Sequence, residues 1–305
     1  MRVQLFDQPL PTGVTLACRA TGPADAPRRA VFLHGFPEAA FAWDDVISAL
    51  AAADPGLRCV APNQRGYAGS SAPAEVSAYR AKHLVADIAA LLDVVAGPGQ
   101  PIDLLVAHDW GGGVAWNFAA LLPQRVRQLV IINSPHPGAM LRELRRSQQQ
   151  RDASQYMTML VQPDAAQLLA ADDFAVLFGK LDGLGGSEKP AWLTPAVRAQ
   201  YRDVWSRGLD GALNWYRASP LRPPTRADDP ALAAVVLPDS VVNVRVPTTV
   251  LWGLADRALC PGLIADLDGW VPGIQVHTRP DASHWIVHEH PDWVIGHIRA
   301  ALARV

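Results

Sequence analysis

A carboxylate at the junction of a strand and a helix is the residue of this sequence best suited to chemistry. The stretch Leu104–Gly113 runs from a buried apolar segment through the letters AHDWG into a glycine-rich helix start. Such a strand–turn–helix pattern is typical of a nucleophile elbow, and Asp109 stands at the exposed position of the turn. The free N–H groups of the following helix favour an ionised carboxylate there. By itself Asp109 is equally well explained as a helix N-cap, so the assignment depends on its partners.

Two later segments supply those partners in the order nucleophile, acid, histidine. The apolar run Thr249–Leu251 is followed by a turn that carries Asp256, and His284 precedes a final amphipathic helix. This chain order is the one that the elbow requires. We expect Asp256 to orient His284 and His284 to activate water. Asp281 is the weaker candidate for the orienting acid, because it lies in the same loop as the histidine.

The loop after an earlier strand carries the letters HGFP at positions 34–37. In this kind of site that loop offers one backbone N–H to an oxyanion, here the N–H of Phe36. The residue after the nucleophile, Trp110, offers the second N–H. We also expect the side chains of His34, Pro37 and Trp110 to contact the substrate.

Metal and cofactor sites are not indicated. The two histidines of the HEH segment 288–290 point to different faces of a helix and have no third ligand at metal spacing, so we interpret this segment as a solvated helix face. Cys18, Cys59 and Cys260 are far apart and odd in number, which predicts neither a zinc site nor a disulfide framework. We therefore expect no metal and no cofactor.

Short apolar runs predict the strands that position these residues. They alternate with helical periodicities, one from Leu84 to Val95 and one from Gly113 to Leu122. This rhythm predicts an α/β fold with a mostly parallel central sheet covered by helices on both faces. The predicted strands are Ala30–Leu33, Cys59–Ala61, Ile102–Val106, Leu129–Ile132 and Thr249–Leu251.

The rhythm changes between Pro135 and about residue 240, where helical patches are separated by proline- and glycine-rich breaks. The predicted helices there are 140–149, 164–171, 195–205 and 211–217. We interpret 135–240 as a helical cap inserted into a core formed by 1–134 and 241–305. An ordinary run of surface helices is the alternative.

Composition excludes several classes of function. Half of the 305 residues are hydrophobic, which is enough for a large core. The net charge is −2 and the sequence contains no basic stripe, so no nucleic-acid partner is expected. A membrane span needs about 18 consecutive apolar residues, and no such run occurs. The first seven residues lack the apolar stretch of a signal peptide. We expect a cytoplasmic protein.

These motifs resemble those of the epoxide hydrolases of the α/β-hydrolase superfamily, over nearly the whole chain. The matching letters are HGFPE at 34–38, NQRGY at 63–67, HDWGG at 108–112, and the segments around Asp256 and His284. Ala107 stands where glycine is commoner, and Ala68 where the family often has glycine or serine. Neither departure removes a chemical group. The resemblance implies an α/β-hydrolase fold with a helical cap.

Two tyrosines separate epoxide hydrolases from their relatives. The segments SQYM at 154–157 and NWYR at 214–217 are similar to those that carry the family's lid tyrosines. The resemblance implies that Tyr156 and Tyr216 hydrogen-bond the epoxide oxygen, and the chain has only five tyrosines. The alternative is that both are packing residues with a hydroxyl at the surface.

The implied reaction has two steps. Asp109 attacks an epoxide carbon and forms an ester, and water activated by His284 then attacks the ester carbonyl. The oxyanion lies against the N–H groups of Phe36 and Trp110. The product is a vicinal diol, the partners are a small epoxide and water, and a homodimer is allowed.

Other readings stay open at this stage. A haloalkane or haloacetate dehalogenase uses the same aspartate–histidine machinery, although Phe36 offers no halide-binding side chain and Trp110 stands where haloacetate enzymes carry arginine. A serine esterase is disfavoured because no serine occupies an elbow. A non-catalytic binding protein would not need Asp109, Asp256 and His284 together. An enzyme that opens an epoxide with a substrate hydroxyl is a further alternative.

Overall fold

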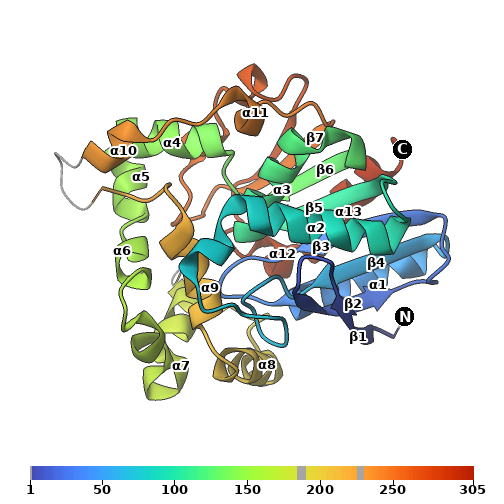
Figure 1. Ribbon diagram of the computed structural model, residues 1–305, viewed down its shortest axis with the longest axis horizontal. Coiled ribbons are helices and arrows are strands. Elements are labelled where there is room, and N and C mark those ends of the chain that lie inside the picture. Colours follow the sequence, from blue (N-terminus) through green and yellow to red (C-terminus); the bar gives the residue numbers. More distant parts are fainter. Residues whose placement is uncertain (1, 184–189, 225–229) are drawn as a thin grey trace.

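An eight-stranded sheet forms the centre of the protein (Figure 1). The computed structural model describes residues 2–183, 190–224 and 230–305. The strand order is β1-β2-β4-β3-β5-β6-β7-β8; β1 and β2 pair antiparallel, as do β2 and β4, and all other neighbours are parallel. The bounds are β1 Gln4–Pro9, β2 Thr15–Thr21, β3 Arg28–Leu33, β4 Leu57–Pro62, β5 Ile102–His108, β6 Val126–Ile132, β7 Thr248–Gly253 and β8 Gln275–Arg279.

The five predicted strands are β3 to β7, so the predicted mostly parallel sheet is confirmed. The sequence did not indicate β1, β2 or β8. In the edge strands β1 and β8 most side chains are exposed or half-buried. An edge strand that faces solvent carries no apolar run, and apolar runs were the signal for the other five.

Helices cover both faces of the sheet. Alternate side chains of a strand point to opposite faces, so Ala30 and Phe32 of β3 pack in one apolar cluster while Val31 and Leu33 pack in the other. The first face is covered by α1 (Asp44–Ala53) and α13 (Pro291–Leu302), and the second by α2 (Ala81–Ala96) and α3 (Trp110–Leu121). The short helix α12 (Ile286–Glu289) precedes α13.

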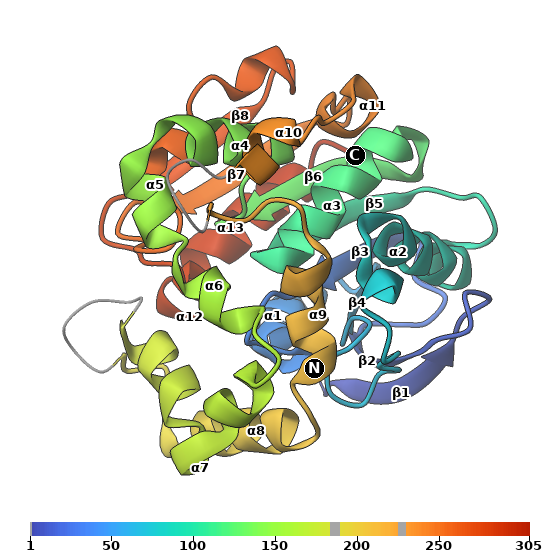
Figure 2. The same cartoon turned by 60° about the vertical axis from the view of Figure 1, so that its left-hand side comes forward.

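A helical block lies between β6 and β7 in the chain, and most of it lies to one side of the sheet (Figures 1 and 2). The term helical block is used below for the described residues between 137 and 242. The predicted helices at 195–205 and 211–217 are confirmed by α8 and α9. The block consists of α4 Pro137–Arg146, α5 Gln148–Ala153, α6 Tyr156–Leu160, α7 Ala165–Gly183, α8 Pro195–Ser206, α9 Asp210–Ala218, α10 Pro230–Ala234 and α11 Asp239–Val242.

Two predicted helices of the block differ from the structure. The helix expected over 140–149 is broken at Ser147, whose side chain accepts a hydrogen bond from the N–H of Gln150 and so caps a new helix, α5. The helix expected to end at residue 171 does leave helical geometry at Ala171–Phe174, but the chain then continues as the second half of α7. Apolar periodicity therefore resolved neither the break at Ser147 nor the kink at Ala171–Phe174.

The helical block docks on loops that follow two strands of the sheet. In α8, the Tyr201 hydroxyl donates to Glu38 at 2.9 Å and the Trp205 indole N–H donates to the Pro37 carbonyl at 2.7 Å. In α9, the Trp215 indole N–H donates to the Arg65 carbonyl at 2.9 Å. The block thus lies over the carboxyl ends of β3 and β4. In the described residues, no helix is long and apolar enough to cross a membrane.

Candidate active site

The turn between β5 and α3 holds Asp109 in a strained backbone conformation, with φ 49° and ψ −123°. Such values for a residue other than glycine persist only when the surroundings impose them. The Ser134 hydroxyl donates to the Asp109 carbonyl at 2.6 Å, and a Cβ on Gly111 would lie 2.5 Å from the Leu33 carbonyl oxygen. The close approach of β3 explains why the elbow requires glycine at position 111.

The carboxylate of Asp109 faces two of the predicted site residues. Its Oδ1 accepts the backbone N–H of Phe36 at 2.8 Å, and its Oδ2 lies 3.6 Å from Nε2 of His284. The N–H expected to stabilise an oxyanion therefore already points at the carboxylate. The other carboxylate oxygen, Oδ2, therefore faces His284.

Asp256 holds the other nitrogen of His284. Nδ1 of His284 donates to Oδ2 of Asp256 at 2.7 Å, which directs Nε2 toward Asp109. Three further donors fix the Asp256 carboxylate: the Asn133 amide at 2.7 Å and the N–H groups of Ala258 and Leu259 at 2.8 and 2.9 Å. The acid beside the histidine is thus Asp256, in agreement with the chain order.

The weaker candidate, Asp281, lies apart from this group. Its side chain is exposed and pairs with Arg279. Because it does not contact the histidine, it cannot orient the imidazole.

The charges of these groups depend on each other. Burial by itself would raise the pKa of Asp256, but His284 and the donors around the carboxylate hold that pKa below its usual value. Burial by itself would lower the pKa of His284, but Asp256 and then Asp109 raise it to about 9. The acidic neighbours thus favour the charged imidazolium of His284 in the free site.

Glu38 is a site residue that the motif analysis did not single out. It is buried, and it accepts from His108 Nδ1 at 3.0 Å, from His288 Nε2 at 2.5 Å and from the Tyr201 hydroxyl. Burial would raise the pKa of Glu38, but His288 and His108 hold it well below the usual value. Nε2 of His108 also faces the His284 carbonyl at 2.9 Å. Glu38 therefore joins β5, α12 and α8.

The interpretation of 288–290 as a solvated helix face is wrong for its first two residues. His288 binds Glu38 and stacks on Trp192 with ring centroids 4.3 Å apart. Glu289 accepts the N–H and the hydroxyl of Ser283, at 2.8 and 2.5 Å. The carboxyl group that draws His288 inward lies 250 positions earlier in the chain. Among the described residues, no group of three or more potential ligands is placed to hold a metal ion.

Asn133 was also missed. It follows β6, its amide Nδ2 donates to Asp256, and its Oδ1 accepts the Gly253 N–H at 2.9 Å. A polar residue directly after a buried apolar strand was the available signal, because the carboxyl ends of parallel strands meet at one edge of a sheet.

The two tyrosines come from different helices of the block. Tyr156 begins α6 and lines the cavity, whereas Tyr216 of α9 is only 2% exposed and packs edge-on against Trp110 and Phe36, with ring centroids 4.9 and 5.4 Å apart. The two tyrosine rings are 6.3 Å apart. Burial, reinforced by the charge of Asp109, raises the pKa of both phenols, so both stay protonated at neutral pH. A surface hydroxyl is ruled out for Tyr216.

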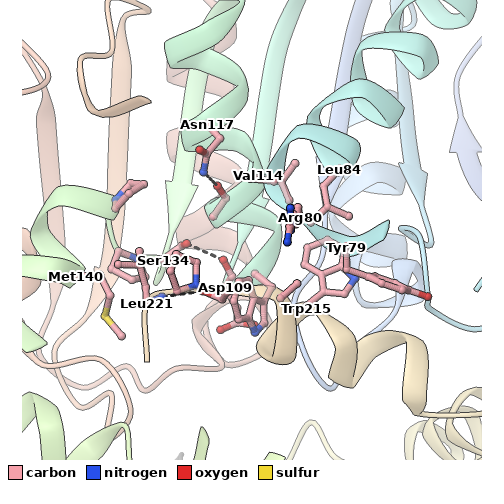
Figure 3. Close-up of a pocket in the computed structure, with 18 of the residues that line it drawn as sticks. Tyr79, Arg80, Leu84, Asp109, Val114, Asn117, Ser134, Met140, Trp215 and Leu221 are labelled. Carbon is pink, nitrogen blue, oxygen red and sulfur yellow. Dashed lines mark hydrogen bonds between the residues drawn. The ribbon is translucent and has the colours of Figure 1, made fainter. Parts of the chain in front are cut away.

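A cavity of about 600 Å³ opens beside the elbow (Figure 3). Asp109, Trp110 and Tyr156 lie in its lining, which is otherwise mostly apolar. Its size is within the usual range for pockets that bind small molecules.

His34 and Pro37 are not in the lining of this cavity. His34 is fully buried; its Nδ1 faces the Gly35 carbonyl at 3.0 Å and its Nε2 accepts the Gln64 N–H at 3.3 Å. The Pro37 carbonyl is the acceptor of Trp205. Both residues therefore shape the loop that presents the Phe36 N–H, while Trp110 alone of the three expected substrate contacts reaches the cavity.

Comparison with known proteins agrees with this geometry. The sequence model of the α/β hydrolase fold family matches residues 31–291. The AB hydrolase superfamily protein YfhM of Bacillus subtilis is 33% identical over 92% of this chain and 91% of its own length. Epoxide hydrolase 1 of Caenorhabditis elegans is 30% identical over 92% of this chain and 66% of its own length.

Solved structures show the same likeness. The crystal structure of the Bacillus megaterium epoxide hydrolase in complex with an inhibitor is 29% identical, with a TM-score of 0.85 over 98% of this chain and 100% of that one. The chain therefore belongs to the α/β-hydrolase fold family and is a hydrolase of its epoxide-hydrolase group.

Proposed function

We propose that this enzyme hydrolyses an epoxide to a vicinal diol through an ester on Asp109. The observation that carries the proposal is the arrangement around one carboxylate. Oδ2 of Asp109 lies 3.6 Å from Nε2 of His284, which Asp256 holds, and the cavity on the open side is lined by Tyr156. The attacking carboxylate and an acid thus line one cavity, and a base lies beside the carboxylate.

In the first step a carboxylate oxygen attacks a saturated carbon of the epoxide. Oδ1 is held by the Phe36 N–H, which leaves Oδ2 as the attacking atom. The carbon–oxygen bond of the ring breaks, and the ring oxygen takes a proton from a tyrosine. Tyr156 and Tyr216 suit this role because their raised pKa values keep them neutral donors.

In the second step water attacks the ester carbonyl. His284 takes a proton from that water, and the developing oxyanion lies against the N–H groups of Phe36 and Trp110. The intermediate collapses: the acyl carbon–oxygen bond of the ester breaks, the leaving oxygen takes the second proton of the water, and the diol leaves with the Asp109 carboxylate restored. His284 keeps the proton that it took from the water, which restores the imidazolium of the free enzyme.

The charge of Asp109 links the two steps. Its negative charge helps to raise the pKa of His284 in the free enzyme. Esterification removes that charge, so the pKa of His284 falls and the imidazolium passes its proton to the tyrosine that gave one up in the first step. The neutral imidazole that remains can then deprotonate the water.

The proposal gives residues 135–240 the role of a cap, because the helical block supplies both tyrosines. Segments 184–189 and 225–229 of that range lie outside the described residues. A homodimer and a cytoplasmic location also belong to the proposal. Size-exclusion chromatography with light scattering checks the first, and fractionation of the source cells checks the second.

The first test traps the ester. In His284→Ala the first step needs no base, so an adduct of substrate mass is expected on the intact protein while turnover falls roughly 10²- to 10⁴-fold. Peptide mapping places the adduct on Asp109. The matched control, His284→Ala combined with Asp109→Asn, accumulates none. Loss of activity without any adduct contradicts the two-step scheme.

A second assay separates the proposal from its closest rival. Wild-type enzyme and Asp109→Asn are incubated with a panel of epoxides and a panel of haloalkanoates. Diol formation by the wild type alone supports the proposal. Halide release without diol would reassign the enzyme to the dehalogenases and would leave Tyr156 and Tyr216 without their role.

A further inference from the structure

A lysine lies over the ring of one of the two proposed acids. The ammonium nitrogen of Lys180, in the second half of α7, is 4.5 Å from the ring centroid of Tyr156. At this distance a cation is attracted by the negative face of an aromatic ring. Among the described residues, no second cation lies over the ring of Tyr156 and none lies over that of Tyr216. The two tyrosines therefore differ in their charged surroundings.

The packing of α7 against α8 fixes the helical turn that carries Lys180 (Figure 2). The Phe178 ring packs on Trp205 with centroids 4.9 Å apart, and Asp182 pairs with Arg198 at 2.8 Å. Asp182 is thus occupied by an arginine of the neighbouring helix. Within the ranges that the structure describes, no carboxylate forms an ion pair with Lys180, so its charge faces the aromatic ring.

The partial burial of Lys180 strengthens this contact. The side chain is half-buried, and burial lowers the pKa of its ammonium from the ordinary value of 10.5. A cation that has lost part of its hydration is attracted more strongly to a ring than an exposed one. The charge of Lys180 therefore acts on Tyr156 with less screening than a surface pair would experience.

The surroundings of the Tyr156 phenol create the need for such a cation. Burial, followed by the charges of Asp109 and Asp256, raises the pKa of Tyr156. These effects keep the phenol protonated in the free enzyme, but they also oppose the phenolate that forms when the proton is given up. Lys180 acts in the opposite direction, because a positive charge beside the ring favours the anion.

The first step of the proposed reaction makes the contact stronger as it proceeds. Oδ2 of Asp109 forms a bond to an epoxide carbon, the ring carbon–oxygen bond breaks with its electron pair on oxygen, and that oxygen takes the proton of Tyr156. The electron pair of the broken O–H bond stays on the tyrosine. A neutral ring offers a cation only a quadrupole, whereas a phenolate offers a full negative charge. An interaction that strengthens toward the transition state accelerates the step.

We propose that Lys180 is a positioning residue that holds the ring of Tyr156 and stabilises its phenolate during epoxide opening. The inference rests on the proposed function and adds a residue to it. Lys180 is not in the lining of the cavity, so it acts through Tyr156 and not on the substrate.

The kinetic test measures the rate of ester formation in the His284→Ala background, where the ester is expected to accumulate. Lys180→Met keeps the length of the side chain and removes its charge, so this rate should fall about tenfold. Lys180→Arg keeps the charge and should restore most of the rate. The control is Arg202→Met, which removes a cation that lies 4.8 Å from the Phe178 ring of the same helix and should leave the rate unchanged.

Tyrosine variants separate an effect of charge from a structural one. Tyr156→Phe keeps a ring under the ammonium but has no proton to give, so Lys180→Met should cause no further loss in this background. Tyr216→Phe leaves the lysine–tyrosine pair intact, and the loss of about tenfold should persist there. An equal loss in the Tyr156→Phe background would show that Lys180 only supports the helical block, and this result overturns the proposal.

A titration without substrate separates this inference from the proposed function. Tyr156 is replaced by a difluorinated tyrosine, whose phenol is more acidic, and its ionisation is followed by fluorine nuclear magnetic resonance. Lys180→Met should raise the pKa of this phenol by about one pH unit, because the cation that favours the anion is gone, and Lys180→Arg should not.

The titration and the kinetics together decide the assignment. A raised pKa together with slower ester formation supports it. An unchanged pKa overturns it even if epoxides are hydrolysed, and a raised pKa without slower ester formation overturns the role of Lys180 in the reaction. If the wild type opens no epoxide, the proposed function fails, while the titration still shows whether Lys180 acts on Tyr156.

Discussion

The charge of Asp109 acts on three neighbouring groups. Burial raises the pKa values of Tyr156 and Tyr216, Asp256 raises that of His284, and the charge of Asp109 adds to each of these shifts. In the proposed reaction the carboxylate becomes an ester and this added part is lost, which lowers the pKa of His284 before the second step.

Replacing Asp109 should therefore change the titration of its neighbour. In Asp109→Asn we expect the pKa of His284 to fall below the value of about 9 that it has in the wild type. Nuclear magnetic resonance of isotopically labelled imidazoles measures it directly. His136, whose pKa burial lowers to about 4, is the internal control and should not move. An unchanged His284 pKa would show that Asp109 does not supply the charge.

At the scale of elements, α9 meets the loop after β4 at two glycines. A Cβ on Gly211 would lie 2.5 Å from Cα of Gly66, so this helix approaches the core as closely as backbone allows. The same helix carries Trp215, whose indole binds the Arg65 carbonyl, and Tyr216. The position of one proposed acid is thus set by a contact between two backbones.

Gly211→Ala should displace α9 and move Tyr216. We expect a loss of about 1–3 kcal/mol in the free energy of unfolding, as for other overpacked sites. We also expect kcat/KM to fall toward the value of the Tyr216→Phe variant. Gly179→Ala in α7 is the matched control, because nothing lies within 4 Å of its Cβ position. Thermal denaturation and kinetics check both variants. Wild-type behaviour of Gly211→Ala would contradict the close contact.

The sequence predicted the elements whose own residues show a pattern along the chain, such as an apolar run or a glycine that ends a helix. Both faces of β3 to β7 are covered, so these strands appear as apolar runs, and α2 ends where Gly97 follows Ala96. The edge strands β1 and β8 lack that signal. The break at Ser147 depends on one side-chain hydrogen bond, which apolar periodicity does not report.

At the scale of the whole molecule, buried histidines set the pH of greatest stability. Burial lowers the pKa of His34 and of His136 to about 4, although the backbone carbonyl beside each ring acts to raise it. Their contribution is full above the ordinary pKa of about 6.5 and is lost as the pH falls toward 4. His284 acts in the opposite direction, because its contribution is full below about 6.5 and is lost as the pH rises through 9.

We therefore expect the unfolding free energy to be greatest near pH 6.5. Urea denaturation measured at a series of pH values between 4 and 9 gives the profile. His136→Gln should flatten part of the decline on the acid side and leave the alkaline side unchanged. A profile without a maximum in this interval would contradict the assigned pKa shifts.

The sequence by itself determined the elbow, the chain order of Asp109, Asp256 and His284, and the central strands. These features are local: a tight turn and a buried strand each leave a pattern within about ten consecutive residues. The tertiary structure alone decided that Glu38 joins the elbow to His288, that Asn133 holds Asp256, and that Lys180 lies over the ring of Tyr156. Such contacts join residues 100 or more positions apart or depend on how two helices pack, and neither leaves a spacing that can be read along the chain.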